Sequence, residues 1–479
     1  MNTDKAQIRV YPCPSVVKKI QAPPSQTHYP AWFNFLVFGP GFGRNWRAML
    51  RLLGQNLKGP AMGSGIAHPA GEANACGPER QQAPGSGRGS RRGSARLLLL
   101  WAVALTICPL AAGALNVPGV IIDHSPAASG IYIGSPSLAM LSKTDYIASH
   151  DEFGPRSSEQ TRAVTQVFAS RDRGQTWTNI ARVDGQFWST LFTHRGALYL
   201  IGTDRHHGHA IIRRSTDGGF TWTAPKDAKS GLLRPQAEFH CAPVPVLEHD
   251  GRLWRAFEHR EPPAGWGVTY RAVMFSAPAN ADLLDAANWT LSNFLPGDTN
   301  WLNGNFGGWL EGNAVVTTEG KVADLLRVDA PELPERAALV TISRDGRTAA
   351  FDPATGFVEL PGGAKKFTVR FDPAGELYWS LAAIVPPAFA KAGPPATIRN
   401  TLALIHSMDL VGGWKVHSIL LQHPDTARHG FQYVDWQFDG SDIIAVCRTA
   451  GDDAQGGAHN FHDANYLTFH RIADFRQRD

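Results

Sequence analysis

Hydrophobic residues in this chain fall into short runs separated by turns, from Val117 to about residue 470. Runs of about 4–8 residues, bounded by Gly, Asp, Asn or Pro every 8–12 residues or so, are typical of all-β proteins. We find no sustained helical period and expect at most one short helical turn, within Asn280–Asn288. The pattern predicts an all-β sandwich, barrel or propeller. The clearest predicted strands are Ala210–Arg214, Leu253–Phe257, Ala314–Thr317, Leu402–His406 and Asp442–Cys447.

A repeated octapeptide favours the propeller. Ser170–Trp177 and Ser215–Trp222 both have the form Ser-x-Asp-x-Gly-x-Thr-Trp and start 45 residues apart. The Asp can accept hydrogen bonds from turn N–H groups, and the Gly supplies a positive φ. The octapeptide resembles the Asp box of sialidase-like β-propellers, which lies in the turn between the outer strands of a blade. The resemblance implies that these turns are structural and peripheral, and that they carry no chemistry.

Weaker copies of the octapeptide set the expected number of blades. They begin at Ser276, Ser343 and Ser407, so that the five starting serines are spaced by 45, 61, 67 and 64 residues. A further blade around Tyr433–His470 would make six, and the strand Val117–Ile122 would close the ring beside it. We therefore expect a six-bladed β-propeller of the sialidase type, with seven blades as the alternative.

Charge separates the N-terminal part of the chain from the rest. Residues 1–114 hold 13 of the 46 Lys and Arg but 3 of the 42 Asp and Glu, which leaves residues 115–479 with a net charge of −6. The predicted propeller domain, residues 115–479, is therefore mildly acidic, and a nucleic-acid partner is not expected. Residues 1–87 form a low-complexity leader; we expect a mis-called start, with Met62 as one candidate, or a disordered leader as the alternative.

Residues 88–114 have the three parts of a signal peptide. Arg88, Arg91, Arg92 and Arg96 precede the apolar run Leu97–Ile107, and residues 112–114 offer a small-x-small cleavage site. The sequence thus predicts a secreted or periplasmic protein, with no stable membrane insertion because the apolar run is short. Cys241 and Cys447 remain after cleavage, and they could form one bridge or stay as two buried thiols.

The resemblance to sialidases extends to candidate site residues. Sialidases bind the substrate carboxylate with three arginines and use an Asp acid/base and a Tyr nucleophile activated by a Glu, an exception to the two-carboxylate scheme of glycosidases. The segment around Glu311 and Arg327 is similar to the one that supplies the Glu and the second Arg. Arg399 resembles the third Arg, and Tyr433 the nucleophile. Taken singly, each could instead be an ordinary ion pair, a solvated arginine or a core tyrosine.

The front of the domain departs from the sialidase pattern. Residues 132–138 keep a Pro-Ser-Leu frame but place Gly134 where the family has its first arginine. A bidentate contact between Arg and a carboxylate is among the stronger charged interactions, so this change bears on the substrate. His150 and Asp151 follow the next predicted strand. We expect Asp151 to be the general acid, with Glu152 as a competitor and His150 beside it.

Histidines in predicted loops open a second chemistry. No pair has a convincing zinc spacing with a third ligand, so neither a metal nor another cofactor is expected. Clusters lie at 206–209 and 459–463. We predict a sialidase-like exo-glycosidase that hydrolyses a terminal acidic sugar of a glycan and acts as a monomer. The alternatives are a polysaccharide lyase, in which arginines neutralise a uronate and a His or Tyr removes a proton, and a non-catalytic glycan-binding propeller.

Overall fold

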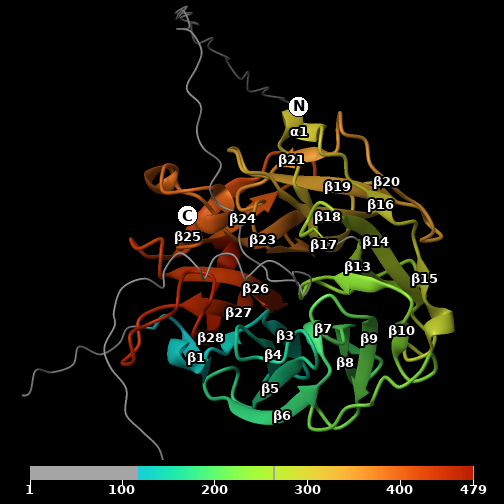
Figure 1. The fold of residues 1–479 in the computed structure, drawn as a ribbon, viewed down its shortest axis with the longest axis horizontal. Helices are drawn as coiled ribbons and strands as arrows, with labels where there is room; N and C mark the ends of the chain where they lie inside the picture. Colours follow the sequence, from blue (N-terminus) through green and yellow to red (C-terminus); the bar gives the residue numbers. More distant parts are fainter. Residues whose placement is uncertain (1–116, 263–264, 478–479) are drawn as a thin grey trace, which may run out of the picture. The chain divides into compact units, whose positions relative to one another are not determined.

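The computed structural model describes residues 117–262 and 265–477, which form six antiparallel sheets around a central axis (Figure 1). This is a six-bladed β-propeller, as the spacing of the repeats predicted, and not a seven-bladed one. The predicted leader and signal peptide lie outside the described residues.

The blades are numbered in chain order, and their strands have the following bounds. Blade 1 contains β2 (Tyr132–Ile133), β3 (Ser137–Met140), β4 (Tyr146–Phe153), β5 (Val164–Ser170) and β6 (Thr178–Asp184). Blade 2 contains β7 (Phe187–His194), β8 (Ala197–Thr203), β9 (Ala210–Ser215) and β10 (Leu232–Arg234). Blade 3 contains β11 (Glu238–His240), β12 (Leu247–His249), β13 (Arg252–Arg260), β14 (Tyr270–Pro278), β15 (Thr290–Leu291) and β16 (Leu295–Pro296).

The remaining three blades complete the ring. Blade 4 contains β17 (Gly308–Val316), β18 (Val322–Asp329), β19 (Arg336–Ile342), β20 (Ala349–Ala350) and β21 (Phe357–Glu359). Blade 5 contains β22 (Phe367–Asp372), β23 (Leu377–Ala383), β24 (Thr401–Ser407) and β25 (Lys415–Gln422). Blade 6 contains β26 (Gly430–Asp439), β27 (Asp442–Ala450), β28 (Tyr466–Ile472) and β1 (Val120–His124).

Helical structure is confined to single turns in the described part of the chain. The α-helical turn is α1 (Trp301–Gly304), and the 3-10 turns are η1 (Ala127–Ser129), η2 (Ala286–Asn288), η3 (Pro387–Phe389), η4 (Pro395–Thr397) and η5 (Phe475–Gln477). The turn expected within 280–288 is η2, where the Asp285 carboxylate accepts the Ala287 N–H. Across residues 117–262 and 265–477, no helix has the length and apolar character needed to cross a membrane.

The ring is closed by a strand from the beginning of the domain. β1 pairs antiparallel with β28, placing Val120 opposite Phe469 and His124 opposite Tyr466. The closing strand predicted at 117–122 is thus present, shifted toward the C-terminus by a few residues. Because β1 and blade 1 are joined by a short connection, the last blade is fastened to the first.

Two kinds of contact hold neighbouring blades together. A hydrophobic cluster fills each of the six blade-to-blade interfaces, because the strands alternate so that both faces of a blade present apolar side chains. Near the axis, buried polar side chains reach across to the next blade. These hydrogen bonds are Ser137 Oγ to Asp435 Oδ2, Leu191 N–H to Ser137 Oγ, Thr190 Oγ1 to Val244 O, Gly312 N–H to Glu258 Oε1, Val369 N–H to Asn313 Oδ1 and Thr368 Oγ1 to Val434 O.

The two octapeptides form the same turn. In the first, both the Thr176 N–H and the Thr176 hydroxyl donate to Asp172, while the Gly174 N–H donates to Ser170 Oγ. The second turn repeats each of these contacts between the equivalent residues. The turns join β5 to β6 and β9 to β10, the outer strands of blades 1 and 2. The three weaker copies also begin at the end of the third strand of their blades.

The cysteines left open by the sequence are two buried thiols. Cys241 and Cys447 are free, and burial raises the pKa of Cys241 to about 12 and that of Cys447 to about 11. Both are therefore protonated and unreactive at neutral pH.

Candidate functional site

Two predicted site residues lie in β-bulges of innermost strands. Glu311 in β17 has φ 50° and Tyr433 in β26 has φ 55°, and at each position the register with the next strand shifts. A bulge of this kind turns a side chain away from the alternating pattern of its strand. Trp188 in β7 has the same conformation, with φ 49°, so three blades have a bulge of this kind in their innermost strand.

Glu311 and Arg327 form a buried ion pair. Arg327 lies on the neighbouring strand β18, and its Nη1 donates to Glu311 Oε2 at 2.9 Å. Burial raises the pKa of Glu311, but the charge and hydrogen bond of Arg327, together with the charges of His240 and Arg399, hold that pKa below its ordinary value. Glu311 is therefore a carboxylate at neutral pH. The second oxygen of Glu311 has no hydrogen bond within the described part of the chain and is not closed off from solvent.

Tyr433 lies against two further arginines. The guanidinium carbon of Arg399 is 5.6 Å from the Tyr433 ring centroid, and that of Arg448 is 4.9 Å from it. Both distances are within the range of cation–π attraction. The positive charge of Arg327 also interacts with Tyr433. Two guanidinium groups, from blades 5 and 6, thus lie over one phenol ring, and a third from blade 4 interacts with it through its charge.

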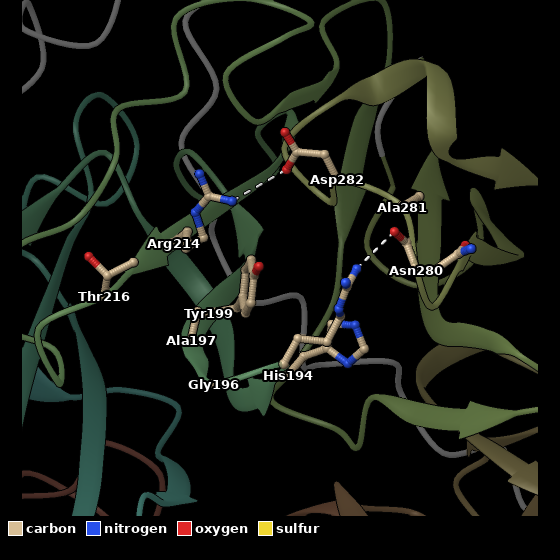
Figure 2. A pocket seen from close by; sticks show the side chains of 10 residues that line it. His194, Gly196, Ala197, Tyr199, Arg214, Thr216, Asn280, Ala281 and Asp282 are labelled. Atoms are coloured by element: carbon tan, nitrogen blue, oxygen red, sulfur yellow. Dashed lines mark hydrogen bonds and ion pairs between the residues drawn. The ribbon is translucent and has the colours of Figure 1, made fainter.

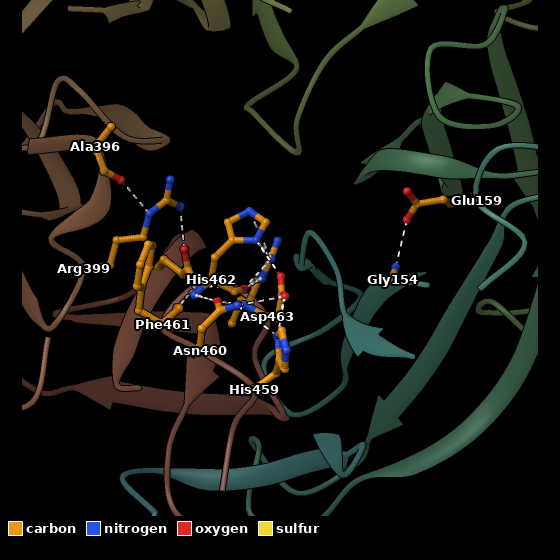
Figure 3. A network of polar contacts seen from close by, with 11 residues as sticks. Gly154, Glu159, Ala396, Arg399, His459, Asn460, Phe461, His462 and Asp463 are labelled. Atoms are coloured by element: carbon orange, nitrogen blue, oxygen red, sulfur yellow. Dashed lines mark hydrogen bonds and ion pairs between the residues drawn. The ribbon is translucent and has the colours of Figure 1, made fainter. Parts of the chain in front are cut away.

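The backbone holds Arg399 and Arg448 in place. The Arg399 Nε donates to Ala396 O at 2.9 Å, and Figure 3 shows this contact beside the loop that carries Phe461 and His462. Arg448 donates from its Nε to His462 O at 3.1 Å, and its guanidinium lies over the ring of Phe153 at 4.3 Å. Because these side chains are fixed before any ligand arrives, little conformational entropy is lost on binding.

Two nitrogen atoms of this arginine cluster stay without a partner in the described part of the chain. Arg327 Nη2 and Arg448 Nη1 make no hydrogen bond among the described residues, and neither atom is sealed from solvent. Burial lowers the pKa of Arg448 to about 10, which leaves it charged at neutral pH. Guanidinium groups with free N–H donors are the side chains that best match a carboxylate. The cluster of Arg327, Arg399 and Arg448 is therefore a candidate carboxylate-binding site.

Arg448 is the residue that sequence reasoning missed. It lies in β27, which continues beyond Asp442–Cys447, the mostly apolar run predicted as a strand. A charged residue inside such a strand is rarely buried without a partner or a function. The charge of Arg448 in this strand was therefore the signal in the sequence that the residue has a buried partner or a function.

The position of Gly134 explains the missing first arginine in steric terms. Its N–H donates to Asp151 O at 2.6 Å, and a Cβ placed on Gly134 would lie 2.4 Å from the same oxygen. No side chain fits at this position without a backbone shift. The third cation of the cluster comes from blade 6 instead of blade 1.

Asp151 lies behind the surface of the site. It is 1% exposed, its Oδ1 accepts the Thr165 hydroxyl at 2.8 Å, and its Oδ2 accepts the Trp188 N–H at 2.7 Å. Burial raises the pKa of Asp151 to about 7, and the hydrogen bonds and the charges of His150 and Arg448 oppose this rise. The structure thus brings Asp151 near the cluster, with both carboxyl oxygens engaged.

His150 and Glu152 point away from the cluster, although both neighbour Asp151 in β4. His150 Nε2 bonds to Asp123 Oδ2 at 2.8 Å, and its ring stacks on Phe168 between blades 6 and 1. Glu152 accepts from Gln166 at 2.6 Å and pairs with Arg182 at 3.3 Å. The strand alternation explains this, because residues adjacent to Asp151 face the other side of the sheet. The structure does not bring His150 to the site.

The two histidine clusters have different environments. Burial lowers the pKa of His206 to about 4, and His207 Nε2 contacts the Tyr270 hydroxyl at 2.6 Å. In the other cluster Asp463 contacts both His459 and His462 at 2.9 Å (Figure 3). Among the described residues, no group of three or more His, Cys, Asp or Glu has the arrangement of a metal site.

A separate surface pocket lies away from this cluster. Its volume is about 510 Å³, and its lining includes His194, Arg214 and Asp282, with Arg214 and Asp282 3.5 Å apart (Figure 2). It contains none of the predicted site residues.

Comparison with solved structures identifies the type of propeller. The chain is similar to a Hadza microbial sialidase, with 12% identity and a TM-score of 0.50 over 74% of this chain and 68% of that one. It is also similar to an α-L-arabinanase of Penicillium chrysogenum (14% identity, TM-score 0.47, 76% and 99% covered) and to a sialidase of Trypanosoma rangeli (14%, 0.46, 74% and 56%). No protein-family model and no curated protein sequence matches the chain. The fold is that of the six-bladed, sialidase-type propellers.

Proposed function

We propose that this propeller hydrolyses the glycosidic bond of a terminal sugar that carries a carboxylate, as a sialidase-like exo-glycosidase does. One observation carries the proposal: Arg399 and Arg448 lie over the ring of Tyr433, while Arg327, paired with the Glu311 carboxylate, interacts with Tyr433 through its charge. Such a cluster suits an acidic sugar whose reactive carbon lies next to a nucleophile. The solved sialidases with the same fold agree with this class of reaction.

The proposed roles follow from charge. The arginines hold the substrate carboxylate, and Tyr433 attacks the anomeric carbon because a neutral phenol is not repelled by that carboxylate. Glu311, ionised beside Arg327, accepts the phenol proton. Arg448 replaces the arginine of the first blade, because no side chain fits at Gly134.

The leaving group also needs a proton donor. The assignment of this role to Asp151 stays a prediction. Its pKa of about 7 suits an acid at neutral pH, whereas its two occupied oxygens do not suit direct contact with a substrate.

The experiment measures release of 4-methylumbelliferone from three glycosides: an α-sialoside, a β-D-glucuronide and a neutral α-L-arabinofuranoside. We expect turnover of an acidic glycoside and none of the neutral one. Tyr433→Phe should lower kcat/KM by more than about 1,000-fold, since the nucleophile is removed. Arg448→Lys should lower it by about 10–100-fold, because hydrogen bonds to a charged group are lost.

Arg252→Lys is the matched control. Arg252 lies 5.6 Å from the ring of Trp254, a stack like that of Arg448 but remote from the cluster. Its replacement should leave turnover unchanged. Full activity of Tyr433→Phe would overturn the nucleophile. An ultraviolet-absorbing unsaturated product from a uronate polymer would replace the hydrolase with a lyase, and saturable glycan binding without either product would make the protein a glycan-binding propeller.

A further inference from the structure

Blade 3 presents a buried pair of acid and imidazole that the proposed roles do not use. His240, at the end of β11, contacts Glu258 in β13 through its Nδ1, 2.7 Å from Glu258 Oε2. His240 is 5% exposed and Glu258 is 0% exposed. A carboxylate that accepts the Nδ1 proton fixes the ring orientation and makes Nε2 the atom available for proton exchange.

Glu258 connects this pair to the bulge that carries Glu311. Its other oxygen, Oε1, accepts the N–H of Gly312 at 3.0 Å, across the interface between blades 3 and 4. Glu258 thus holds the imidazole and the backbone beside Glu311 at the same time. The charge of His240 acts on Glu311, which agrees with their proximity.

Aromatic rings fix the plane of the His240 imidazole. Tyr270 stacks on it with ring centroids 4.9 Å apart, and Trp188 contacts it edge-on at 4.6 Å. Trp188 is the bulged residue of β7 whose N–H binds Asp151. His240 Nε2 makes no hydrogen bond among the described residues and is not a sealed atom. His240 Nε2 is therefore free to bond, whereas the rest of the ring packs against Tyr270 and Trp188.

Asp151 differs from His240 in this respect. Both oxygens of Asp151 already accept hydrogen bonds, and the Trp188 backbone lies over one of them. Both oxygens of Asp151 are therefore held within the protein, and the residue is 1% exposed. His240 keeps Nε2 without a partner among the described residues.

We propose that His240, positioned by Glu258, is the residue that exchanges a proton with the leaving-group oxygen. This inference rests on the proposed glycosidase function. His240 is the catalytic group, and Glu258 is a positioning residue.

The proton and electron pairs balance over the two steps. In the first step the Tyr433 oxygen bonds to the anomeric carbon and gives its proton to Glu311, while the glycosidic C–O bond breaks and the His240 Nε2 proton moves to the departing oxygen. In the second step water attacks the anomeric carbon and gives one proton to His240 Nε2. The bond to Tyr433 then breaks, and the phenol regains its proton from Glu311. The net reaction consumes one water.

The proton exchange depends on the groups that face the ring. Besides Glu258 in β13, these are Tyr270 in β14, His207 in the turn after β8, and Glu311 in β17, with His206 packed against His207. Burial lowers the pKa of His206 to about 4, so it carries no charge at neutral pH.

The test compares His240→Gln with Asp151→Asn on two substrates of one acidic sugar, an activated 4-methylumbelliferyl glycoside and an unactivated alkyl glycoside. Loss of a general acid affects a poor leaving group more than a good one. We expect His240→Gln to lower kcat/KM on the alkyl glycoside by about 100-fold or more and on the activated one by less than about 10-fold. It should also remove one limb of the pH–rate profile, an effect that a loss of folding would not produce.

Glu258→Gln provides the graded comparison. A glutamine can accept the Gly312 N–H or the His240 Nδ1–H through its one oxygen. The kcat/KM of Glu258→Gln on the alkyl glycoside should therefore lie between those of wild type and His240→Gln. If His240→Gln keeps wild-type turnover on the alkyl glycoside while Asp151→Asn loses it, the proposal is overturned and the Asp151 assignment is supported. If the wild-type protein turns over no acidic glycoside, the proposed function itself fails.

A second measurement needs no turnover. Diethylpyrocarbonate modifies accessible neutral imidazole nitrogens, and peptide mapping by mass spectrometry identifies each modified histidine. We expect His240 to react in the folded protein and His150 to stay unmodified, because both nitrogens of His150 are bonded and the residue is buried. A His240 as inert as His150 would show that its Nε2 is not open, which contradicts the inference.

Discussion

Glu311 and Tyr433 have a backbone conformation that residues other than glycine rarely adopt. Each such residue costs about 1–3 kcal/mol and persists only where the surrounding structure enforces it. Here the enforcement comes from the bulge registers and from buried partners, Arg327 for Glu311 and the two stacked arginines for Tyr433. The cost is consistent with side chains that are re-aimed for binding or chemistry.

Asp151 gives a prediction for stability as a function of pH. Its folded pKa of about 7 lies above the ordinary 3.8 because of burial, so the folded state favours the protonated acid. The stabilisation is complete below about pH 4 and is lost as the pH rises toward 7. Asp151→Asn should therefore gain stability relative to wild type over this range, by up to about 4 kcal/mol.

Urea unfolding at pH 4, 5, 6 and 7 measures this difference. The changed contacts with Thr165 and Trp188 alter the free energy of unfolding of Asp151→Asn by the same amount at every pH. The change of the stability difference with pH is therefore what tests the pKa of Asp151. Parallel stability curves for the two proteins would show that Asp151 ionises normally in the folded state.

The residues of the site were predictable to different degrees. Glu311, Arg327, Arg399 and Tyr433 were predicted because the resemblance to sialidases gave their order and local context, and the structure brings these four candidates together. Arg448 and His240 were missed because each depends on contacts between blades, His462 and Tyr433 for Arg448, and Glu258 for His240. No local pattern encodes such contacts, although the charge of Arg448 in a mostly apolar strand was a signal that it has a buried partner.

At the scale of elements, the two octapeptide turns have the same internal hydrogen bonds but pack against different neighbours. Gly174 has φ +88°, and a Cβ there would lie 2.2 Å from the Phe469 ring. Gly219 has φ +99°, and the nearest atom to its Cβ would be 3.3 Å away. The first turn packs against blade 6, whereas a methyl group in the second turn would require only small shifts of the Ile180 and Leu198 side chains.

Gly174→Ala should therefore destabilise the protein more than Gly219→Ala. Both substitutions place a side chain at positive φ, at a cost of about 1–2 kcal/mol. Overpacking against Phe469 should add about 1–3 kcal/mol in the first turn alone. Thermal unfolding of the two variants measures this difference, and Gly196→Ala, at φ +78° with no atom within 4 Å, isolates the backbone cost. Equal losses at Gly174 and Gly219 would contradict the packing argument.

At the scale of the whole molecule, the ring depends on one short strand. β1 completes blade 6, and Asp123 in β1 binds His150 of blade 1 at 2.8 Å. His150, predicted as part of the active site, is therefore in the structure a link of the ring closure. Its bond to Asp123 raises the pKa of His150 against the opposing effect of burial.

Asp123→Asn should weaken this closure by about 1–3 kcal/mol at pH 6, the value of a hydrogen bond to a charged group. Because the folded pKa of His150 is raised, the stabilisation is present below about pH 6.5 and is lost as the pH rises through that folded value. The destabilisation by Asp123→Asn, followed by chemical unfolding from pH 6 to pH 9, should therefore shrink with rising pH. A constant difference would mean that His150 is neutral throughout.

The sequence by itself determined the strand pattern and the closing strand and favoured six blades over seven, because period-two alternation and the turn residues of the repeats are local properties. It also determined which polar residues were candidates. Only the tertiary structure decided which of them meet. Adjacent residues of a strand face opposite sides, so His150 and Asp151 separate, and the ring brings Arg448 of blade 6 and His240 of blade 3 toward residues far away in the chain. Such contacts arise from the closure of the propeller and leave no mark in any single segment.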